Sequence, residues 1–128
     1  MKIAWDRVVN MTLWVLQAFL ALVFLLSGAA KFSPYGNFWM DLFAKIGIGQ
    51  WFRYFTGGLE IICAVFLMIP RTSAVAAALL ACTMAGATFT HLCILRDGYA
   101  AMFPGLALVI LVVIAWKRGL KFHAVNQN

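Results

Sequence analysis

Three ionisable residues interrupt the long apolar runs of this sequence, and they are the residues best placed to do chemistry: Lys31, Glu60 and His91. Because a charge in lipid is costly, an ionisable residue inside a membrane span marks a functional site by default. A deeply placed carboxylate must be paired or protonated, and imidazole exchanges protons near neutral pH. We therefore predict a site in which Glu60 and His91 handle protons, while Lys31 holds Glu60 charged or polarises a carbonyl.

Three further residues are predicted to line the same site as its cofactor-binding part: Gln17, Gly57 and Thr88. Gln17 shares a helix face with Lys31, Gly57 clears space one turn before Glu60, and Thr88 precedes His91 on one stripe. A structural alternative stays open for each ionisable residue. Lys31 alone suits a snorkelling anchor, His91 alone suits an interfacial residue, and a Glu60–Lys31 pair needs no chemistry at all.

The elements that must position these residues are four apolar runs, expected as helices over residues 8–31, 51–69, 72–95 and 100–117 of a single domain, 1–128. The chain is 65% hydrophobic and 11% charged, against roughly 45–50% and about 25% in soluble domains. Lipid must therefore be the main solvent and the bilayer the first partner. Spanning segments of about 20 residues must bond their backbone internally. The fold class predicted is all-α, a four-helix transmembrane bundle whose first helix is retained rather than cleaved.

The connection between the first two spans is long enough to hold structure of its own. Its apolar residues recur at helical spacing: Phe38, Trp39, Leu42, Phe43 and Ile46. With Asn37 as a candidate N-cap and Gly47 as a stop, we expect a short amphipathic helix lying in the interface; an ordered loop is the alternative. Pro70 ends the second span, and Thr72 or Ser73 is expected to cap the third.

Charge placement predicts the orientation. If the N-terminus is cytoplasmic, one side carries Lys2, Arg7, Arg71, Lys117, Arg118 and Lys121, and the other carries Lys31, Lys45, Arg53 and Arg96. The excess of Lys and Arg favours both termini inside. Side chains lean toward the N-terminus of their own helix, so Lys31 and His91 lean into the membrane while Glu60 leans out. We expect the three to converge in the outer half of the bundle.

Several functional classes are disfavoured by the same residues. Lys and Arg stand singly at the ends of apolar runs rather than on one basic face, so nucleic acid is not an expected partner. The three cysteines form no zinc spacing, and no metal site is predicted. Cys63 and Cys82 are expected near the bilayer middle without a disulfide. Since His91 is the histidine within a span, a haem held by two histidines of one chain is disfavoured.

Short motifs in this order resemble the DoxX family over about residues 13–116. They are Phe24-Leu25-Leu26-Ser27-Gly28-Ala29-Ala30-Lys31-Phe32, then Gly57-Gly58-Leu59-Glu60 with Ile69-Pro70-Arg71, then Thr90-His91-Leu92. The resemblance implies a four-helix transmembrane bundle in which Lys31, Glu60 and His91 are the family site. The family takes its name from a membrane subunit of a thiosulfate:quinone oxidoreductase. Other members are linked to redox or thiol stress, and distant relatives look like chaperones or cargo factors for membrane proteins.

Two functional hypotheses follow from the resemblance. The first is a redox-associated membrane subunit of the bacterial inner membrane that binds a quinone-like lipophile, with quinone as the candidate cofactor, or an electron-transfer partner such as a redox subunit. The second is a chaperone or scaffold that docks another membrane protein. A co-purified quinone would favour the first hypothesis, and stoichiometric recovery of a membrane partner would favour the second.

Overall fold

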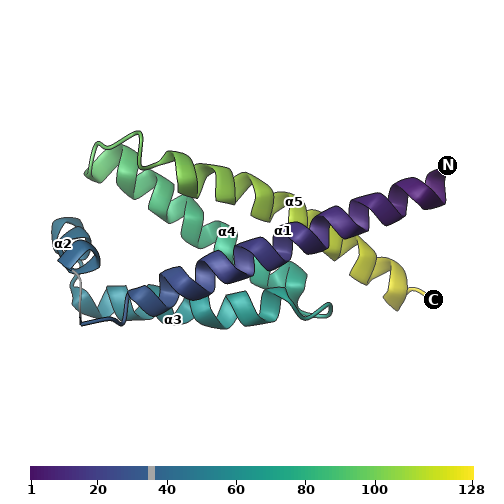
Figure 1. Ribbon diagram of the computed structural model, residues 1–128, viewed down its shortest axis with the longest axis horizontal. Helices are drawn as coiled ribbons and strands as arrows, with labels where there is room; N and C mark the ends of the chain where they lie inside the picture. Colours follow the sequence, from purple (N-terminus) through teal and green to yellow (C-terminus); the bar gives the residue numbers. More distant parts are fainter. Residues whose placement is uncertain (35–36) are drawn as a thin grey trace.

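The computed structural model describes residues 1–34 and 37–128, and its regular elements are all helical (Figure 1). They are α1 (Lys2–Ala30), α2 (Asn37–Ile46), α3 (Gln50–Leu67), α4 (Ser73–Phe89), the π-helical turn η1 (Thr90–Ile94) and α5 (Met102–Asn126). The described part of the chain contains no strand, which confirms the predicted all-α class. Asn37 was predicted to cap α2, but its side chain lies outside the described residues.

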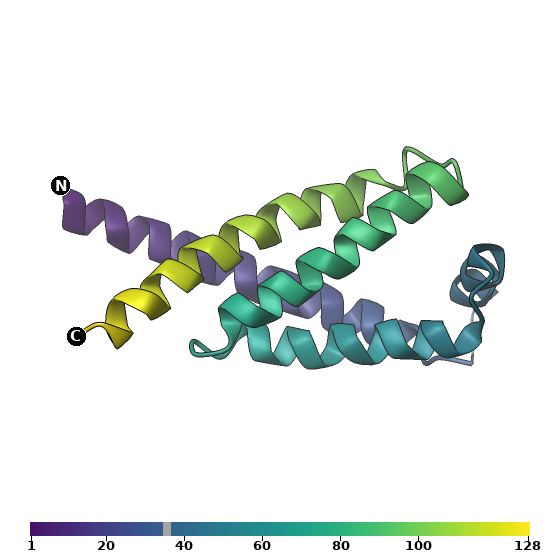
Figure 2. The same cartoon turned by 180° about the vertical axis from the view of Figure 1, so that it is seen from behind.

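The helices form two antiparallel pairs that cross near the middle of the molecule. α1 lies along α3, α4 lies along α5, and the pairs meet through α3 with α4 and through α1 with α5 (Figures 1 and 2). Both chain termini lie at one end of the molecule, and α2 lies at the other. We call the end that holds α2 the ion-pair end and the end that holds the termini the Arg118 end, after the residues described below.

Three helices in the described residues are long and apolar enough to cross a membrane: α1, α4 continued through η1, and α5. α3 is not among them: its 18 residues are long enough, but polar residues, Arg53 and Glu60 among them, make it too polar on average. A helix therefore forms at each of the four predicted spans, and three of the four qualify as spans by length and composition.

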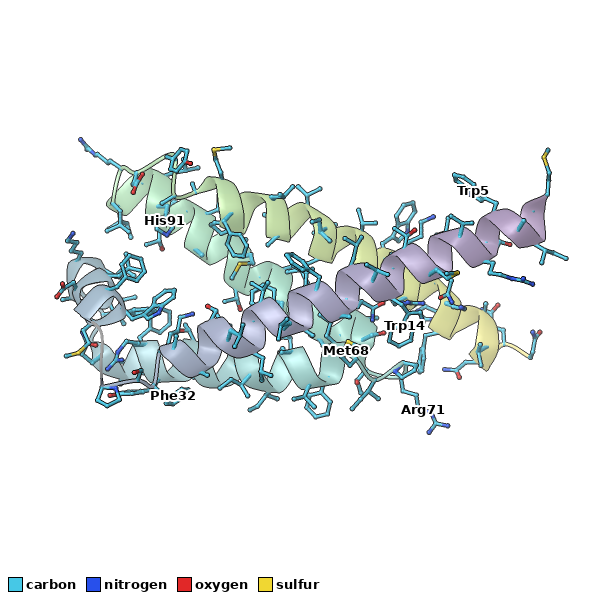
Figure 3. All side chains as sticks on the ribbon, in the orientation of Figure 1. Trp5, Trp14, Phe32, Met68, Arg71 and His91 are labelled. Atoms are coloured by element: carbon cyan, nitrogen blue, oxygen red, sulfur yellow. The ribbon has the colours of Figure 1, made fainter. Side chains whose placement is uncertain are left out.

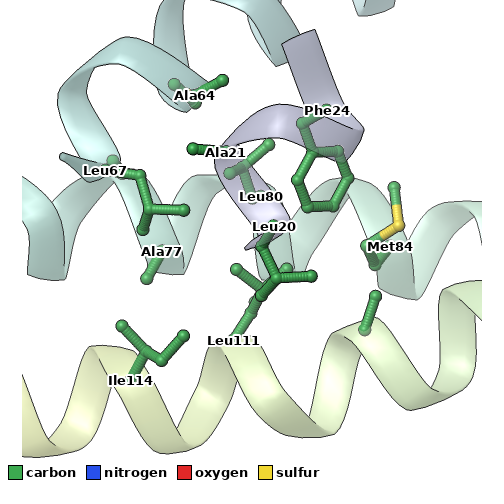
Figure 4. Packing of buried hydrophobic residues seen from close by; sticks show 14 of the residues in the cluster. Leu20, Ala21, Phe24, Ala64, Leu67, Ala77, Leu80, Met84, Leu111 and Ile114 are labelled. Atoms are coloured by element: carbon green, nitrogen blue, oxygen red, sulfur yellow. The ribbon is translucent and has the colours of Figure 1, made fainter. Parts of the chain in front are cut away.

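The apolar core sits where the two pairs cross (Figure 4). Its fully buried large side chains are Phe24 of α1, Leu67 of α3, Leu80 of α4, and Leu111 and Ile114 of α5. Buried Ala76 and Ala77 let α4 approach its neighbours closely, as small residues do in membrane helices. Large apolar side chains also cover the outside of the molecule; Phe19 of α1 and Trp116 of α5 are two examples. This is the distribution expected where the surrounding solvent is lipid.

The helix bounds extend beyond the apolar runs at both termini. α1 begins at Lys2 rather than residue 8, and α5 runs to Asn126 rather than residue 117. Hydropathy locates only the lipid-facing part of a helix, whereas Lys, Arg and Ala continue it into the polar zone.

The predicted helix ends need one correction. Thr72 is at the N-cap position of α4, but its hydroxyl donates to the carbonyls of Phe66 and Ile69 and caps no backbone N–H. The hydroxyl of Ser73 likewise donates to the carbonyl of Pro70. Gly47 does end α2, with a positive φ of 83° that glycine adopts at low cost.

Candidate functional site

The site at the ion-pair end is built on a close crossing of α1 and α3. A Cβ added to Gly28 would lie 2.7 Å from the Gly57 carbonyl oxygen, and one added to Gly57 would lie 3.0 Å from the Gly28 oxygen. Only glycine on both helices permits this approach. Lys31 and Glu60 each follow one of these glycines by three residues, on the same helix face. The crossing therefore brings their side chains together.

Lys31 and Glu60 form a buried ion pair. The Lys31 Nζ donates to both Glu60 carboxylate oxygens, at 2.8 and 2.7 Å, and to the Ser27 hydroxyl oxygen at 3.2 Å. The two side chains are only 5% and 4% exposed. The pairing predicted from depth and side-chain direction is confirmed, and the charge of each group is cancelled by the other.

Aromatic and cationic side chains enclose this pair on the side of α2. The Lys31 Nζ lies 4.3 Å from the centroid of the Trp39 ring. The amphipathic helix α2 therefore covers the Lys31 side of the pair. Phe43 holds α2 against α3 through an edge contact with Phe52 at 5.9 Å. Arg53 is 4% exposed and donates to the carbonyl oxygen of Lys31, which ties the end of α1 to α3.

His91 lies at the same end of the molecule but on the other helix pair, across from Phe32 (Figure 3). Its side chain is half-buried, and its Nδ1 is buried with no hydrogen-bond partner among the described residues. No hydrogen bond in that part of the chain joins it to Lys31 or Glu60. The structure therefore brings two of the three predicted residues together, and it leaves the third on the other helix pair without a hydrogen-bond partner for its Nδ1 among the described residues.

The position of His91 follows from the local backbone. It lies in η1, where the Leu95 N–H donates to the Thr90 carbonyl in the wider π-helical pattern. A π turn inserts an extra residue into the helix between Thr90 and Leu95, so η1 departs locally from the regular α-helical spacing at the segment that carries His91. π-Helical turns are rare and occur frequently at functional sites.

The three residues predicted to bind a cofactor lie in different places. Gly57 adjoins the ion pair at the helix crossing. Thr88 donates to the Met84 carbonyl at 2.7 Å, and its methyl group faces Gly105 of α5. Gln17 lies toward the Arg118 end, where its Nε2 donates to the Leu67 carbonyl at 2.7 Å. Their cofactor-binding role stays a prediction.

Gln17 belongs instead to a second polar group, the Arg118 cluster, defined as Arg118, Asn10 and Gln17. The Arg118 Nε donates to the Gln17 Oε1, and its Nη1 donates to the Asn10 Oδ1, both at 2.7 Å. In the sequence Arg118 counts as a flanking charge, and Asn10 was not among the predicted site residues. A signal was present: Asn10 and Gln17 are seven residues apart, on the face of α1 that also buries Leu13 and Leu20.

The comparisons with known proteins give one match. A sequence model described as the DoxX-like family matches residues 15–115, which is most of the chain. No curated protein and no solved structure matches. The matched segment runs from α1 to α5 and includes Lys31, Glu60 and His91.

Proposed function

Because the chain belongs to the DoxX-like family, we propose a membrane protein whose four long helices all cross the bilayer, α3 included. Its termini lie at one end of the molecule, as an even number of crossings requires. The 18 residues of α3 span about 27 Å at 1.5 Å per residue, close to the hydrocarbon thickness. Its charged residues, Arg53 and Glu60, are buried and bonded within the protein rather than facing lipid.

Cysteine labelling tests this topology. In a background without native cysteines, Ile3→Cys and Val125→Cys should both resist an impermeant thiol reagent added outside intact cells, and both should react after permeabilisation. We expect this result because we propose that the protein lies in a bacterial inner membrane with both termini in the cytoplasm. Labelling of both positions from outside would reverse the orientation, and labelling of only one would exclude four crossings.

For the site itself, we propose that the ion-pair end binds a quinone-like lipophile, directly or as part of a redox complex. The observation that supports this is the unsatisfied His91 Nδ1 at the same end as the neutralised Lys31–Glu60 pair. An unpaired buried polar atom costs free energy unless a partner is supplied. Imidazole nitrogen can donate to a carbonyl or accept from a hydroxyl, so a quinone or quinol oxygen fits it.

The roles of the three residues then differ. His91 would hold the oxygen of the lipophile and exchange a proton there. The Lys31 Nζ already donates to Glu60 and Ser27, so it pairs with Glu60 instead of polarising the ligand. A bound quinone would supply the electron and proton acceptor. The residues of this chain would supply binding, orientation and a proton path.

The test is mass spectrometry of the lipophiles that co-purify with the protein in mild detergent. Wild type should retain a quinone, and His91→Ala should retain about tenfold less, equivalent to about 1.4 kcal/mol of binding. Thr83→Ala is the matched control, since Thr83 is a polar residue of α4 whose hydroxyl donates to the Leu79 carbonyl of its own helix. Equal quinone in all three samples, or none in wild type, would contradict the proposal.

One observation favours a second function, docking of another membrane protein. Ala78, Cys82 and Gly86 recur every four residues on an exposed face of α4, and a Cβ on Gly86 would meet nothing within 4 Å. Small residues at this spacing let membrane helices pack closely. Gly86→Leu should then lower the yield of cross-links formed through Cys82, whereas Gly119→Leu on α5 should not. Unchanged cross-linking in Gly86→Leu would remove the docking proposal.

A further inference from the structure

The Arg118 end contains a hollow of about 550 Å³ between α1, the turn that joins α3 to α4, and α5. Its polar lining is basic, from Arg71, Arg118 and Lys121, with Asn10 beside them, and Trp14 and Phe122 are part of its apolar lining. Figure 3 shows Trp14 and Arg71 near each other in the half of the molecule that holds the termini. The hollow is at the opposite end from the Lys31–Glu60 pair.

The guanidinium of Arg118 carries a buried charge that no carboxylate of the described residues neutralises. The residue is only 8% exposed, and its Nε and Nη1 bond the neutral amide oxygens of Gln17 and Asn10. Its Nη2 is buried and has no partner within residues 1–34 and 37–128. The one ion pair in those residues is Lys31–Glu60. A buried cation without a counter-ion is unfavourable, so this arrangement calls for an anion from outside the chain.

The geometry around Arg118 suits a phosphate. Asn10 and Gln17 accept hydrogen bonds from two of its nitrogens, and the centroid of the Trp14 ring lies 4.8 Å from the guanidinium carbon. A guanidinium fixed in this way is preorganised, and it binds phosphate oxygens in a planar, directional manner. Arg71 and Lys121 are exposed and line the same hollow, where they add two cations; the Lys121 Nζ also donates to the Asn10 Oδ1 at 3.4 Å. Asp6, one turn before Asn10 on α1, is exposed and does not line the hollow.

We propose that this hollow binds the phosphate head group of an anionic membrane lipid. A lipid is favoured over free phosphate because Trp14, Pro70 and Phe122 give the hollow apolar walls. The hollow also lies toward the end of α5, a candidate span, where head groups are found. Basic pockets between spanning helices at the charged side of a membrane recognise such head groups. This proposal is independent of what the ion-pair end binds.

The experiment measures lipid retention by native mass spectrometry of the full chain in a neutral detergent. The probes are phosphatidylglycerol, phosphatidylcholine and inorganic phosphate. Wild type should bind phosphatidylglycerol at least about tenfold more tightly than phosphatidylcholine. The folded double variant Arg71→Gln/Lys121→Gln should bind phosphatidylglycerol about fivefold more weakly for each residue replaced, as expected for basic groups near anionic lipid. Arg118→Gln should abolish the preference.

The matched control is Lys45→Gln/Arg96→Gln, which removes two exposed cations from the ion-pair end and should leave the preference unchanged. Two results would overturn the proposal. One is equal loss in the control and in Arg71→Gln/Lys121→Gln, which would show that only net charge matters. The other is displacement of phosphatidylglycerol by millimolar inorganic phosphate, which would identify the ligand as free phosphate. The double variant leaves Arg118 in place, so the test does not depend on whether Arg118→Gln folds.

Discussion

The two ends of this molecule treat buried charge in opposite ways. At the ion-pair end, Lys31 and Glu60 neutralise each other, and Trp39 of α2 covers them. At the Arg118 end, a buried guanidinium has neutral oxygens, of Asn10 and Gln17, as its hydrogen-bond partners among the described residues, beside a hollow lined with further cations. A charge pair closed within the chain holds helices together, whereas an unmatched charge beside an opening requires a partner from outside.

The largest effect is expected from Glu60→Gln. It leaves the Lys31 ammonium buried without its counter-ion, and breaking a buried pair in this way costs about 3–5 kcal/mol. Unfolding in detergent, followed by helical circular dichroism, measures the loss. A cost below about 1 kcal/mol would place this pair among solvent-screened surface pairs and remove the contrast between the two ends.

A smaller but still large effect is expected from Gly28→Ala. The new methyl group would clash with the Gly57 carbonyl at 2.7 Å, and overpacking of this kind costs about 1–3 kcal/mol. Gly86→Ala is the control, because its Cβ meets open space; it should be neutral or slightly stabilising. Equal effects from the two substitutions would mean that the α1–α3 crossing does not set the geometry of the ion pair.

At the Arg118 end the same kind of change should cost less. Arg118→Gln gives up hydrogen bonds to Asn10 and Gln17, but it strands no opposite charge, so we expect a loss of about 1–2 kcal/mol in lipid-free detergent. The measurement is the same unfolding titration. A loss equal to that of Glu60→Gln would show that a counter-ion for Arg118 is already present within the protein.

The smallest effect on stability is expected from His91→Ala. The Nδ1 has no hydrogen bond to lose among the described residues, so the free energy of unfolding should change by less than about 0.5 kcal/mol, as for most substitutions away from packed features. Quinone retention should fall in the same variant. A large destabilisation would instead give His91 a structural role.

Much of the fold and part of the site could be predicted because they depend on local sequence. The apolar runs locate the helices, since lipid requires internal backbone bonding. The depth of Lys31 and Glu60 along antiparallel helices, with the direction of their side chains, predicts their pairing. Gly57 was predicted to open space beside Glu60, and Gly28 was not assigned a role of its own. They are instead the point where two backbones meet, which depends on both helices at once.

The remaining features arise from tertiary structure. His91 was expected beside Glu60, but it lies on the other helix pair, and the two helix pairs make most of their contacts within each pair. Arg118 resembles an ordinary flanking cation in the sequence. It is buried because α5 crosses α1 at Asn10 and Gln17, a contact between residues more than a hundred positions apart. A hydropathy pattern cannot predict such a contact, because it describes one segment of the chain at a time.

A double-mutant cycle on Lys31 and Glu60 tests directly whether these two residues neutralise each other. If the ion-pair end neutralises itself, Lys31→Met and Glu60→Gln should each destabilise the protein strongly. Together they should cost at least about 2 kcal/mol less than the sum of the single changes, since the double variant strands no charge. Unfolding free energies in one detergent, for the four proteins of the cycle, give the coupling directly. Additivity within about 0.5 kcal/mol, the range seen for independent sites, would contradict the central claim.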